Sequence, residues 1–292
     1  MNYALFGKDM ITHSLPYIRK LIDKLYSTGN SILVYESFYR SIQGKIHFPI
    51  KPDLFNSQKD LMVDTQVLFS FGGDGTILDA VTLVGNSGIP IAGINMGRLG
   101  FLSGIPKEQI IPALDAILLH HYEVDSRTLI RLETKPGLFG ELNYALNDLT
   151  VYKSNAQSML IIKTYVNGDF LNSYWADGLI ISTPTGSTAY SLSCTGPIIT
   201  PGSESLVITP IASHNLTVRP IVIPDDSIIT IRVEGKEPDY FVSLDSRIQP
   251  AHQSVELTIR KAEFKINLLR MKNTSFFQTI REKLNWGLDI RN

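Results

Sequence analysis

The first part of the chain alternates short apolar runs with apolar residues that repeat at helical spacing. Runs such as Tyr3–Gly7 and Val67–Phe69 have the length and apolar content of buried strands. Between the apolar runs at 3–7 and 31–36, apolar side chains recur from Leu15 to Leu25 every three or four residues, and Gly29 ends the pattern. This βαβ order predicts a doubly wound, Rossmann-like parallel sheet for residues 1–121, with strands near 3–7, 31–36, 67–69 and 90–95, helices near 15–25, 77–84 and 106–121, and loops with one short helix over 39–60.

From Tyr122 onward the pattern changes to short segments of alternating or β-branched character, separated by turns. Asn167-Gly168 is a strong two-residue hairpin signal, because both residues tolerate a positive φ. The pattern predicts an all-β domain of two packed sheets, a β-sandwich, over residues 122–270, and a C-terminal segment, 271–292, whose helix returns to the first domain. The strands are expected near 128–134, 146–152, 159–166, 170–174, 179–182, 206–210, 228–233, 240–244, 255–259 and 264–268, and the helix near 275–286.

A glycine-rich turn, Ser70-Phe71-Gly72-Gly73-Asp74-Gly75-Thr76, stands between the apolar run at 67–69 and the helix that follows. Its three glycines let the backbone come close to a ligand, and amides at the start of a helix point toward a bound anion. A phosphate chain suits that geometry. Asp74 would repel phosphate unless it took part in proton transfer or met a metal ion, so it favours chemistry as well as binding.

The turn fits neither of the common nucleotide-binding fingerprints. The turn lacks the Lys-Ser/Thr ending of a Walker loop, and its glycine spacing is not that of a dinucleotide fold. The structural alternative is a bend in which Asp74 only caps a helix that starts near Thr76. Five such residues between a buried strand and a helix favour the functional interpretation.

The composition excludes several kinds of partner and site but indicates no particular reaction. The chain has 292 residues, with 27 Lys plus Arg against 28 Asp plus Glu, so no field of one sign indicates a nucleic-acid partner or an anionic membrane. A single cysteine, Cys194, excludes an internal disulfide and a thiolate-rich metal site. No signal peptide is visible, and no apolar run approaches the roughly 20 residues of a membrane-spanning helix, so a cytoplasmic location is expected.

A second pair of glycines follows the strand predicted at 90–95. The turn Met96-Gly97-Arg98-Leu99-Gly100-Phe101-Leu102 is expected to face the first loop across a crevice, because both turns follow strand ends in a parallel sheet. The ring of Phe101 offers a surface on which a base can stack. The alternative is a loop shaped by its two glycines, with Phe101 in the core, and spacing alone leaves both open.

Two stretches of the all-β part carry more polar groups than plain strands need. Asn147-Asp148 interrupts an apolar run, and an amide beside a carboxylate suits the vicinal hydroxyls of a ribose, although a solvated strand end would show the same pair. Residues 174–193 contain the Asp177-Gly178 turn and then a hydroxyl-rich segment, with Tyr190 available to stack on a base. The Pro-Thr-Gly-Ser-Thr order is poor linker composition, which favours ligand binding over a serine-rich surface loop.

Together these motifs resemble those of bacterial NAD kinases. The Gly-Gly-Asp-Gly-Thr loop at 72–76, the turn at 97–101, the pair at 147–148 and the stretch from 177 to 193 occur in that family's order and near its spacing. Diacylglycerol and sphingosine kinases share the first motif but not the rest. The resemblance implies that Asp74 takes the proton from the 2′-hydroxyl of the adenosine ribose of NAD. Phe101, the stacking candidate, is added to the residues that the resemblance implies. The nucleotide-binding residues expected are Gly72, Gly73, Asp74, Gly75, Thr76, Phe101, Asn147, Asp148, Asp177, Thr188, Ala189, Tyr190, Ser191, Leu192, Ser193 and Ala212.

The activity implied by the resemblance is transfer of the γ-phosphoryl group of ATP to NAD, giving ADP and NADP. It implies a divalent cation, Mg²⁺ or Mn²⁺, which leans on substrate phosphates and needs no dedicated ligand cluster in the chain. A homo-oligomer, tetramer or dimer, is expected because family members are commonly homotetramers. Asp148 is a departure, since the family more often has Glu there and Asp is one methylene shorter.

Two other functions stay open on the sequence. A diacylglycerol-type lipid kinase shares the glycine loop, but it should present an apolar entry for an acyl chain where this chain has hydroxyls. A non-catalytic dinucleotide-binding sensor would use the same polar stretches, and Asp74 would then be incidental.

Overall fold

The computed structural model describes residues 1–8, 14–61, 64–97, 100–155, 159–272 and 274–287. The chain forms two compact units. The first comprises Met1–Ser126 together with Ile266–Asn292, and the second comprises Arg127–Lys265. Two strands, β7 (Tyr122–Glu133) and β18 (Leu257–Met271), run from one unit into the other, so each unit owns part of both strands.

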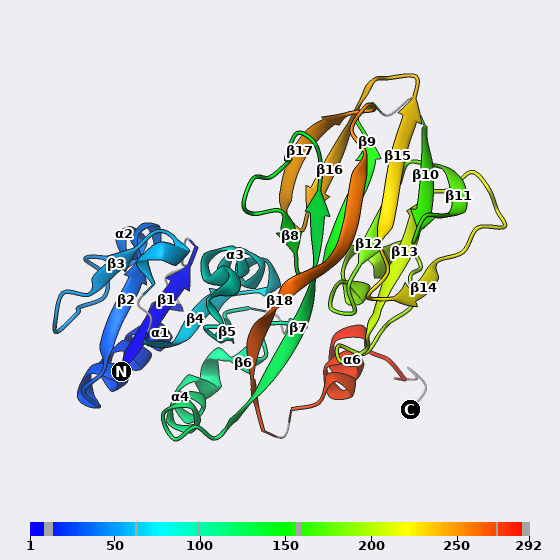
Figure 1. The fold of residues 1–292 in the computed structure, drawn as a ribbon. Helices are drawn as coiled ribbons and strands as arrows, with labels where there is room; N and C mark the ends of the chain where they lie inside the picture. The colour runs from blue at the N-terminus through cyan, green and yellow to red at the C-terminus, as the bar shows by residue number, and fades with distance from the viewer. Residues whose placement is uncertain (9–13, 62–63, 98–99, 156–158, 273, 288–292) are drawn as a thin grey trace. The chain divides into compact units, whose positions relative to one another are not determined.

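A parallel sheet forms the centre of the first unit (Figure 1). Its strands lie in the order β3-β2-β1-β4-β5, and every neighbouring pair is parallel. The end of β18 adds one more parallel pair, between Leu268 and Ile91. The strands are β1 (Asn2–Gly7), β2 (Ser31–Tyr35), β3 (Asp53–Phe55), β4 (Thr65–Gly72), β5 (Ile91–Asn95) and the short β6 (Ile105–Pro106).

Helices cover both faces of this sheet. On one face, Leu21 of α1, Phe38 of α2 and Leu114 of α4 share a core with alternate strand residues. The other face carries α3, because a Cβ added at Gly93 of β5 would meet the Ile77 side chain of that helix. The helices are α1 (Leu15–Ser27), α2 (Glu36–Ile42), α3 (Asp74–Val84), α4 (Ile110–Leu118) and α6 (Phe276–Leu284).

The second unit is an antiparallel sandwich. One sheet has the order β11-β10-β15-β18 and the other β14-β13-β12-β9-β16-β17, with antiparallel neighbours in both. Alternate residues of both sheets, such as Ile162 and Val151, share one apolar core. The elements are β8 (Tyr144–Ala145), β9 (Asp148–Lys153), β10 (Leu160–Val166), β11 (Asp169–Ala176), β12 (Gly178–Ser182), α5 (Tyr190–Ser193), β13 (Ser205–Ile211), β14 (Ile221–Pro224), β15 (Ile229–Gly235), β16 (Asp239–Leu244) and β17 (Arg247–His252).

The predicted fold class is confirmed. The structure has a doubly wound α/β part, an all-β sandwich, and a C-terminal helix, α6, that belongs to the same unit as the N-terminal strands. The predicted hairpin at Asn167-Gly168 joins β10 to β11, and the two residues have φ angles of 52° and 88°. That pair of positive angles matches the twist of the strands it joins.

Several element boundaries differ from the prediction. The strands expected at 255–259 and 264–268 form the single strand β18, in which the buried positions shift by one residue, from Leu257 and Ile259 to Ala262, Ile266 and Leu268. Residues 39–60 contain part of α2 and also strand β3, and the helix expected to reach residue 121 ends at Leu118. The edge strands β14 and β17 escape prediction because each contains a proline.

Candidate active site

β4, a tight turn and α3 bring Asp74 to the carboxyl edge of the parallel sheet. β4 ends at Gly72, Gly73 occupies the position before the helix, and Asp74 is the first residue of α3. No side-chain hydrogen bond caps this helix, so Asp74 is not the cap of a helix that starts near Thr76. The Asp74 carboxylate points instead to the segment that follows β5.

Backbone amides of three consecutive residues hold that carboxylate. Oδ1 accepts the amides of Leu102 and Ser103, both at 3.0 Å, and the Ser103 hydroxyl at 3.1 Å. Oδ2 accepts the amide of Phe101 at 2.8 Å and lies 3.4 Å from Nζ of Lys283. Oδ1 is therefore saturated with donors, whereas Oδ2 has one short hydrogen bond and room for another donor.

These contacts decide the charge of Asp74. Burial alone would raise the pKa of its carboxyl, but the amides of Ser103, Phe101 and Leu102 and the charge of Lys283 hold the pKa below its ordinary value. Asp74 is therefore ionised at neutral pH and able to accept a proton from a hydroxyl that meets Oδ2. Its side chain is 28% exposed, so a ligand can reach it.

Glycines around this carboxylate are of two kinds. A Cβ at Gly100 would lie 1.9 Å from Oδ1, and a Cβ at Gly72 would lie 2.1 Å from the Thr76 hydroxyl, so packing requires both glycines. A Cβ at Gly73 or Gly75 meets nothing within 4 Å, although a glycine inside a helix costs about 0.5–1 kcal/mol relative to alanine. Packing does not require these two glycines. The space they leave adjoins the first turn of α3, where the amides of Asp74 and Gly75 have no helical partner.

The ring of Phe101 is half-buried in this unit. Its centroid lies 6.4 Å from that of Phe276 and 4.7 Å from Nζ of Lys283, both on α6. Arg98 and Leu99, which belong to the same predicted turn, lie outside the described residues. Lys283 was not found from the sequence, because it stands 209 positions from Asp74 and no local motif surrounds it.

A hollow of about 420 Å³ lies beside α3 at the carboxyl ends of β1 and β2. Gly7, Lys8 and Tyr35 line it from the sheet, and Asp79 and Thr82 line it from α3. Nζ of Lys8 and a carboxylate oxygen of Asp79 are 2.5 Å apart. Ligands of open parallel sheets bind beyond the carboxyl ends of the strands, which makes this hollow a candidate for part of a nucleotide.

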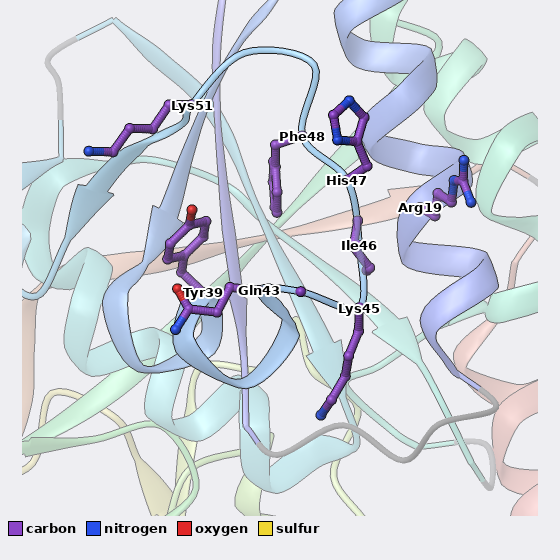
Figure 2. Close-up of a pocket in the computed structure, with 9 residues that line it drawn as sticks. Arg19, Tyr39, Gln43, Lys45, Ile46, His47, Phe48 and Lys51 are labelled. Atoms are coloured by element: carbon purple, nitrogen blue, oxygen red, sulfur yellow. The ribbon is translucent and has the colours of Figure 1, made fainter.

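A second hollow in the first unit, of about 480 Å³, is lined by the basic residues Arg19, Lys45, His47 and Lys51. Figure 2 shows the charged ends of Arg19, Lys45 and Lys51 pointing in different directions. Lys45 donates to the carbonyl of Ser41 at 2.9 Å. A phosphate site needs donors that converge on one point, so this hollow is no candidate for one.

In the second unit, Asp245 holds the corner that contains Asn147 and Asp148. Asp245 lies in the turn between β16 and β17, with a φ of 52°. Its carboxylate accepts the amides of Leu146, Asn147 and Asp148 at 2.9, 2.7 and 3.2 Å, and its own amide donates to the Asp148 carbonyl at 3.0 Å. The sequence reasoning missed Asp245, whose one local signal is a polar pair after the strand that ends at Leu244.

Asp148 begins β9 and is 6% exposed. Oδ1 of Asp148 accepts the hydroxyl of Thr150 at 3.0 Å. Burial raises the pKa of Asp148 to about 7, and the charge of Asp245 adds to the rise. Burial also raises the pKa of Asp245, against the effect of the amides it accepts and of Arg247. Near neutral pH, Asp148 therefore exchanges between an acid that donates a hydrogen bond and a carboxylate that accepts one.

The hydroxyl-rich segment packs on the same corner. Thr183 donates its amide to the Asn147 carbonyl at 2.9 Å and its hydroxyl to the Leu146 carbonyl at 2.6 Å. A Cβ at Gly186 would lie 2.0 Å from the Asn147 carbonyl oxygen, so a glycine is required there. The structure thus brings the two polar stretches of the sandwich together.

Residues 186–193 extend from this packing as a 3₁₀ turn, Gly186–Thr188, and the short helix α5. The Thr188 hydroxyl donates to the Thr185 carbonyl at 3.1 Å. Ser191 is buried, and its hydroxyl lies 2.9 Å from that of Thr209. The remaining predicted residues of this segment, apart from Tyr190, are partly or fully exposed: Ala189, Leu192 and Ser193.

Tyr190 is 47% exposed and stands among ionisable groups. Burial raises the pKa of its phenol, and the charges of Cys194, Asp148 and Asp177 add to the rise. A carboxylate oxygen of Asp177 lies 2.7 Å from Nζ of Lys153. Charged residues predicted from separate motifs therefore act on the pKa of one exposed phenol.

Ala212 follows β13 in the left-handed region, with a φ of 46°. The neighbouring Ile211 accepts the amide of Asp177 at 3.0 Å. Ala212 is exposed, and an alanine at positive φ is uncommon, which marks a backbone held by its surroundings. Ala212 is thus the chain neighbour of a residue that is hydrogen-bonded to Asp177.

No group of three or more His, Cys, Asp or Glu side chains is arranged to hold a metal ion within the described residues. A metal ion at this site would therefore take its ligands mainly from bound phosphates and water, as Mg²⁺ commonly does. In the same residues, no helix has the length and apolar character needed to cross a membrane.

Comparison with known proteins agrees with this architecture. The family model described as the ATP-NAD kinase N-terminal domain matches residues 51–122, and the model of the ATP-NAD kinase C-terminal domain matches residues 146–271. NAD kinases of Cytophaga hutchinsonii and Flavobacterium psychrophilum are 43% and 47% identical to the chain, each over the whole of both sequences.

Two solved structures share the fold. The yeast NADH kinase complexed with NADH aligns with a TM-score of 0.88 at 23% identity, covering 100% of this chain and 89% of that one. The NAD kinase of Archaeoglobus fulgidus in complex with ATP aligns with a TM-score of 0.72 at 24% identity, covering 98% and 99%. These likenesses establish a kinase fold with a doubly wound unit and a sandwich. The chain belongs to the ATP-NAD kinase family, as its motifs indicated.

Proposed function

We propose that this protein transfers the γ-phosphoryl group of ATP to the 2′-hydroxyl of the adenosine ribose of NAD, giving ADP and NADP. A bond forms between the 2′-oxygen and the γ-phosphorus, and the bond from that phosphorus to the β,γ-bridging oxygen breaks. The hydroxyl proton passes to Asp74. Membership of the ATP-NAD kinase family supports this reaction, and the relatives are named for it.

The observation that carries the proposal is the unequal surroundings of the two Asp74 oxygens. Oδ1 accepts three donors, whereas Oδ2 accepts one short hydrogen bond, from the amide of Phe101, and a longer one of 3.4 Å from Nζ of Lys283. Oδ2 is therefore the oxygen that receives the ribose proton. A carboxylate fixed by three backbone amides does not have to reorganise as the proton arrives, and general-base help of this kind contributes about 10²–10⁴-fold in rate.

The first unit is assigned to the phosphoryl donor. The amides of Asp74 and Gly75 lie in the first turn of α3, where they have no helical partner and favour an anion. Thr76 differs, because its amide donates to the Gly73 carbonyl at 3.0 Å. Gly73, where a Cβ would meet nothing within 4 Å, lets the donor phosphates come close, and the hollow at the carboxyl ends of β1 and β2 is suited to another part of the donor nucleotide.

The second unit is assigned to recognition of the dinucleotide. Asn147 and Asp148 supply an amide and a carboxyl group for ribose hydroxyls, and Tyr190 supplies an aromatic surface. Asp177 and Ala212 are assigned to the same dinucleotide-recognition site. The shorter side chain of Asp148 is compatible with this role, because Asp245 fixes its backbone and a water molecule can bridge a missing methylene length.

Three further features complete the proposal. A divalent cation, Mg²⁺ or Mn²⁺, would be held mainly by the ATP phosphates and would supply positive charge to them. The enzyme works in the cytoplasm. It assembles as a homo-oligomer, a tetramer or dimer.

The test is an assay of the purified protein with ATP, Mg²⁺ and either NAD or a diacylglycerol. We expect NADP from the first mixture and no phosphorylated lipid from the second. Phosphorylation of the lipid alone would identify a lipid kinase. Saturable NAD binding without NADP, across Mg²⁺, Mn²⁺ and several phosphoryl donors, would identify a sensor.

A further inference from the structure

The glycine loop carries no cation of its own. Residues 70–76 contain one charged side chain, Asp74, and they lack the lysine with which a Walker loop meets phosphate. Phosphoryl transfer nevertheless develops negative charge on the equatorial oxygens of the moving group, and that charge needs positive groups from the protein as well as the metal ion.

The fold supplies a lysine to this loop from the far end of the chain. Nζ of Lys283, in the last turn of α6, lies 3.4 Å from Oδ2 of Asp74 and 4.7 Å from the ring centroid of Phe101. The ammonium thus approaches Oδ2, the same oxygen that the proposed function assigns to the ribose proton. Oδ1 is already saturated by three other donors.

The contact between Lys283 and Asp74 is loose. A charge-assisted hydrogen bond is usually about 2.7–2.9 Å long, and the separation here is 3.4 Å. The ammonium has three donors, and the lysine side chain is 32% exposed. Lys283 therefore has donors to spare for a second anion beside Asp74.

Packing of α6 sets the direction of this lysine. Ile280 is the buried residue of α6, with 4% exposure, and the ring of Phe276 contacts that of Phe101. Ile280 and Lys283 are three residues apart and lie on the same side of the helix. The face that anchors α6 is thus the face that carries Lys283 to the carboxylate.

We propose that Lys283 binds the phosphoryl group in transit and replaces the lysine that the loop lacks. The proposal rests on the proposed function. Before transfer, the ammonium is shared between Oδ2 of Asp74 and an oxygen of the γ-phosphate. When the ribose proton reaches Oδ2, Asp74 becomes neutral and no longer attracts Lys283, so the ammonium interacts fully with the phosphoryl oxygens at the moment their charge is greatest. Lys283 forms and breaks no covalent bond and keeps its proton.

The test replaces Lys283 by methionine and by arginine, with Arg281→Met as the matched control. Arg281 is another cation in the last turn of α6, so its loss removes equal charge from the same helix. We expect Lys283→Met to lower kcat/KM for ATP about 100-fold while KM for NAD stays within about threefold. Lys283→Arg should recover about tenfold of that loss, and Arg281→Met should stay within about twofold of the wild type.

A purely structural role for Lys283 predicts a different set of results. Lys283→Met would then lower the melting temperature, and Ile280→Ala, which loosens the anchor and keeps the lysine, would reduce kcat/KM equally. That pattern of results would overturn the proposal. A fall in kcat/KM for ATP of less than about twofold in Lys283→Met, or an equal fall in Arg281→Met, would overturn it as well. If Lys283→Met does not fold, Lys283→Gln is measured under the same criteria. A wild-type protein that makes no NADP would instead refute the proposed function.

Discussion

Asp74 in the first unit and Asp148 in the second are both aspartates assigned to the nucleotide, yet their surroundings differ in kind. Three backbone amides and a lysine surround the Asp74 carboxylate and lower its pKa despite burial. Asp148 has the hydroxyl of Thr150 as its donor, and burial together with the neighbouring Asp245 raises its pKa to about 7. One carboxyl is therefore fully ionised at neutral pH, and the other is poised between two charge states.

The difference suits the two aspartates to the two tasks proposed for them. A group that must accept a proton from a substrate is best kept ionised and immobile, and the fixed amides around Asp74 do both. A group that recognises hydroxyls gains from being able to donate as well as accept, which a carboxyl near its pKa can do. The number of backbone donors, three against none, decides which behaviour results.

The largest expected effect comes from removing the base. Asp74→Asn keeps the shape of the side chain but cannot take the ribose proton, so we expect kcat to fall about 10²–10⁴-fold. NAD affinity, measured by titration calorimetry, should stay within a few-fold. Asp115→Asn is the matched control, because Asp115 is a carboxylate of the same unit that pairs with Lys24 at 2.8 Å. Turnover of Asp74→Asn within threefold of the wild type would remove Asp74 from the mechanism.

A smaller effect is expected from displacing the carboxylate without altering it. The Cβ of Gly100→Ala would lie 1.9 Å from Oδ1 of Asp74, so the carboxylate must move. A displacement near 1 Å costs up to about 100-fold in rate, and we expect kcat to fall by about 10–100-fold. Gly104→Ala is the control in the same segment, since a Cβ at Gly104 meets nothing within 4 Å. Equal kcat values for both variants would contradict the prediction.

The smallest effect concerns stability and distinguishes the two carboxyls by sign. The lowered pKa of Asp74 stabilises the fold above its unfolded pKa, and this contribution is lost as the pH falls. The raised pKa of Asp148 acts in reverse: the folded protein binds the extra proton, so stability falls as the pH rises from about 4 to about 7. Asp148→Asn should therefore lose less stability than the wild type between about pH 5 and about pH 8.

Thermal unfolding of the ligand-free protein at these two pH values measures this prediction. We expect the difference between the melting temperatures at the two pH values to be smaller by about 2–4 °C in Asp148→Asn than in the wild type. Asp169→Asn, at an exposed position of the same unit, should leave the gap unchanged. A gap of the wild-type size in Asp148→Asn would mean that Asp148 is not the group that titrates.

Local patterns predicted the parts of the molecule that local forces determine. The strand, glycine turn and helix around Asp74 were predicted because the apolar period changes within a few residues, and the Asn167-Gly168 hairpin because two positive φ angles need those residue types. The single turn of α5 was not predicted, since Tyr190–Ser193 is too short to show a period and serine favours turns over helix interiors. Strand β3 was missed for the same reason of length.

Long-range contacts account for the rest. Lys283 reaches Asp74 across 209 residues, and Asp245 reaches the amides of residues 146–148 from about a hundred residues away. Neither position has a distinctive neighbour in sequence, because what selects it is the spatial partner. The motifs therefore predicted residues for the nucleotide site, but not the side chains that hold those residues in place.

One uninterrupted strand, β18, supplies hydrogen-bonded partners to both units: residues 257–259 pair with β15, and Leu268 pairs with β5. Unfolding of either unit would break backbone hydrogen bonds of β18, a strand that also pairs with strands of the other unit. The two halves therefore lose their structure cooperatively, and amide protons in the middle of β18 are expected to exchange with solvent only when the whole molecule unfolds.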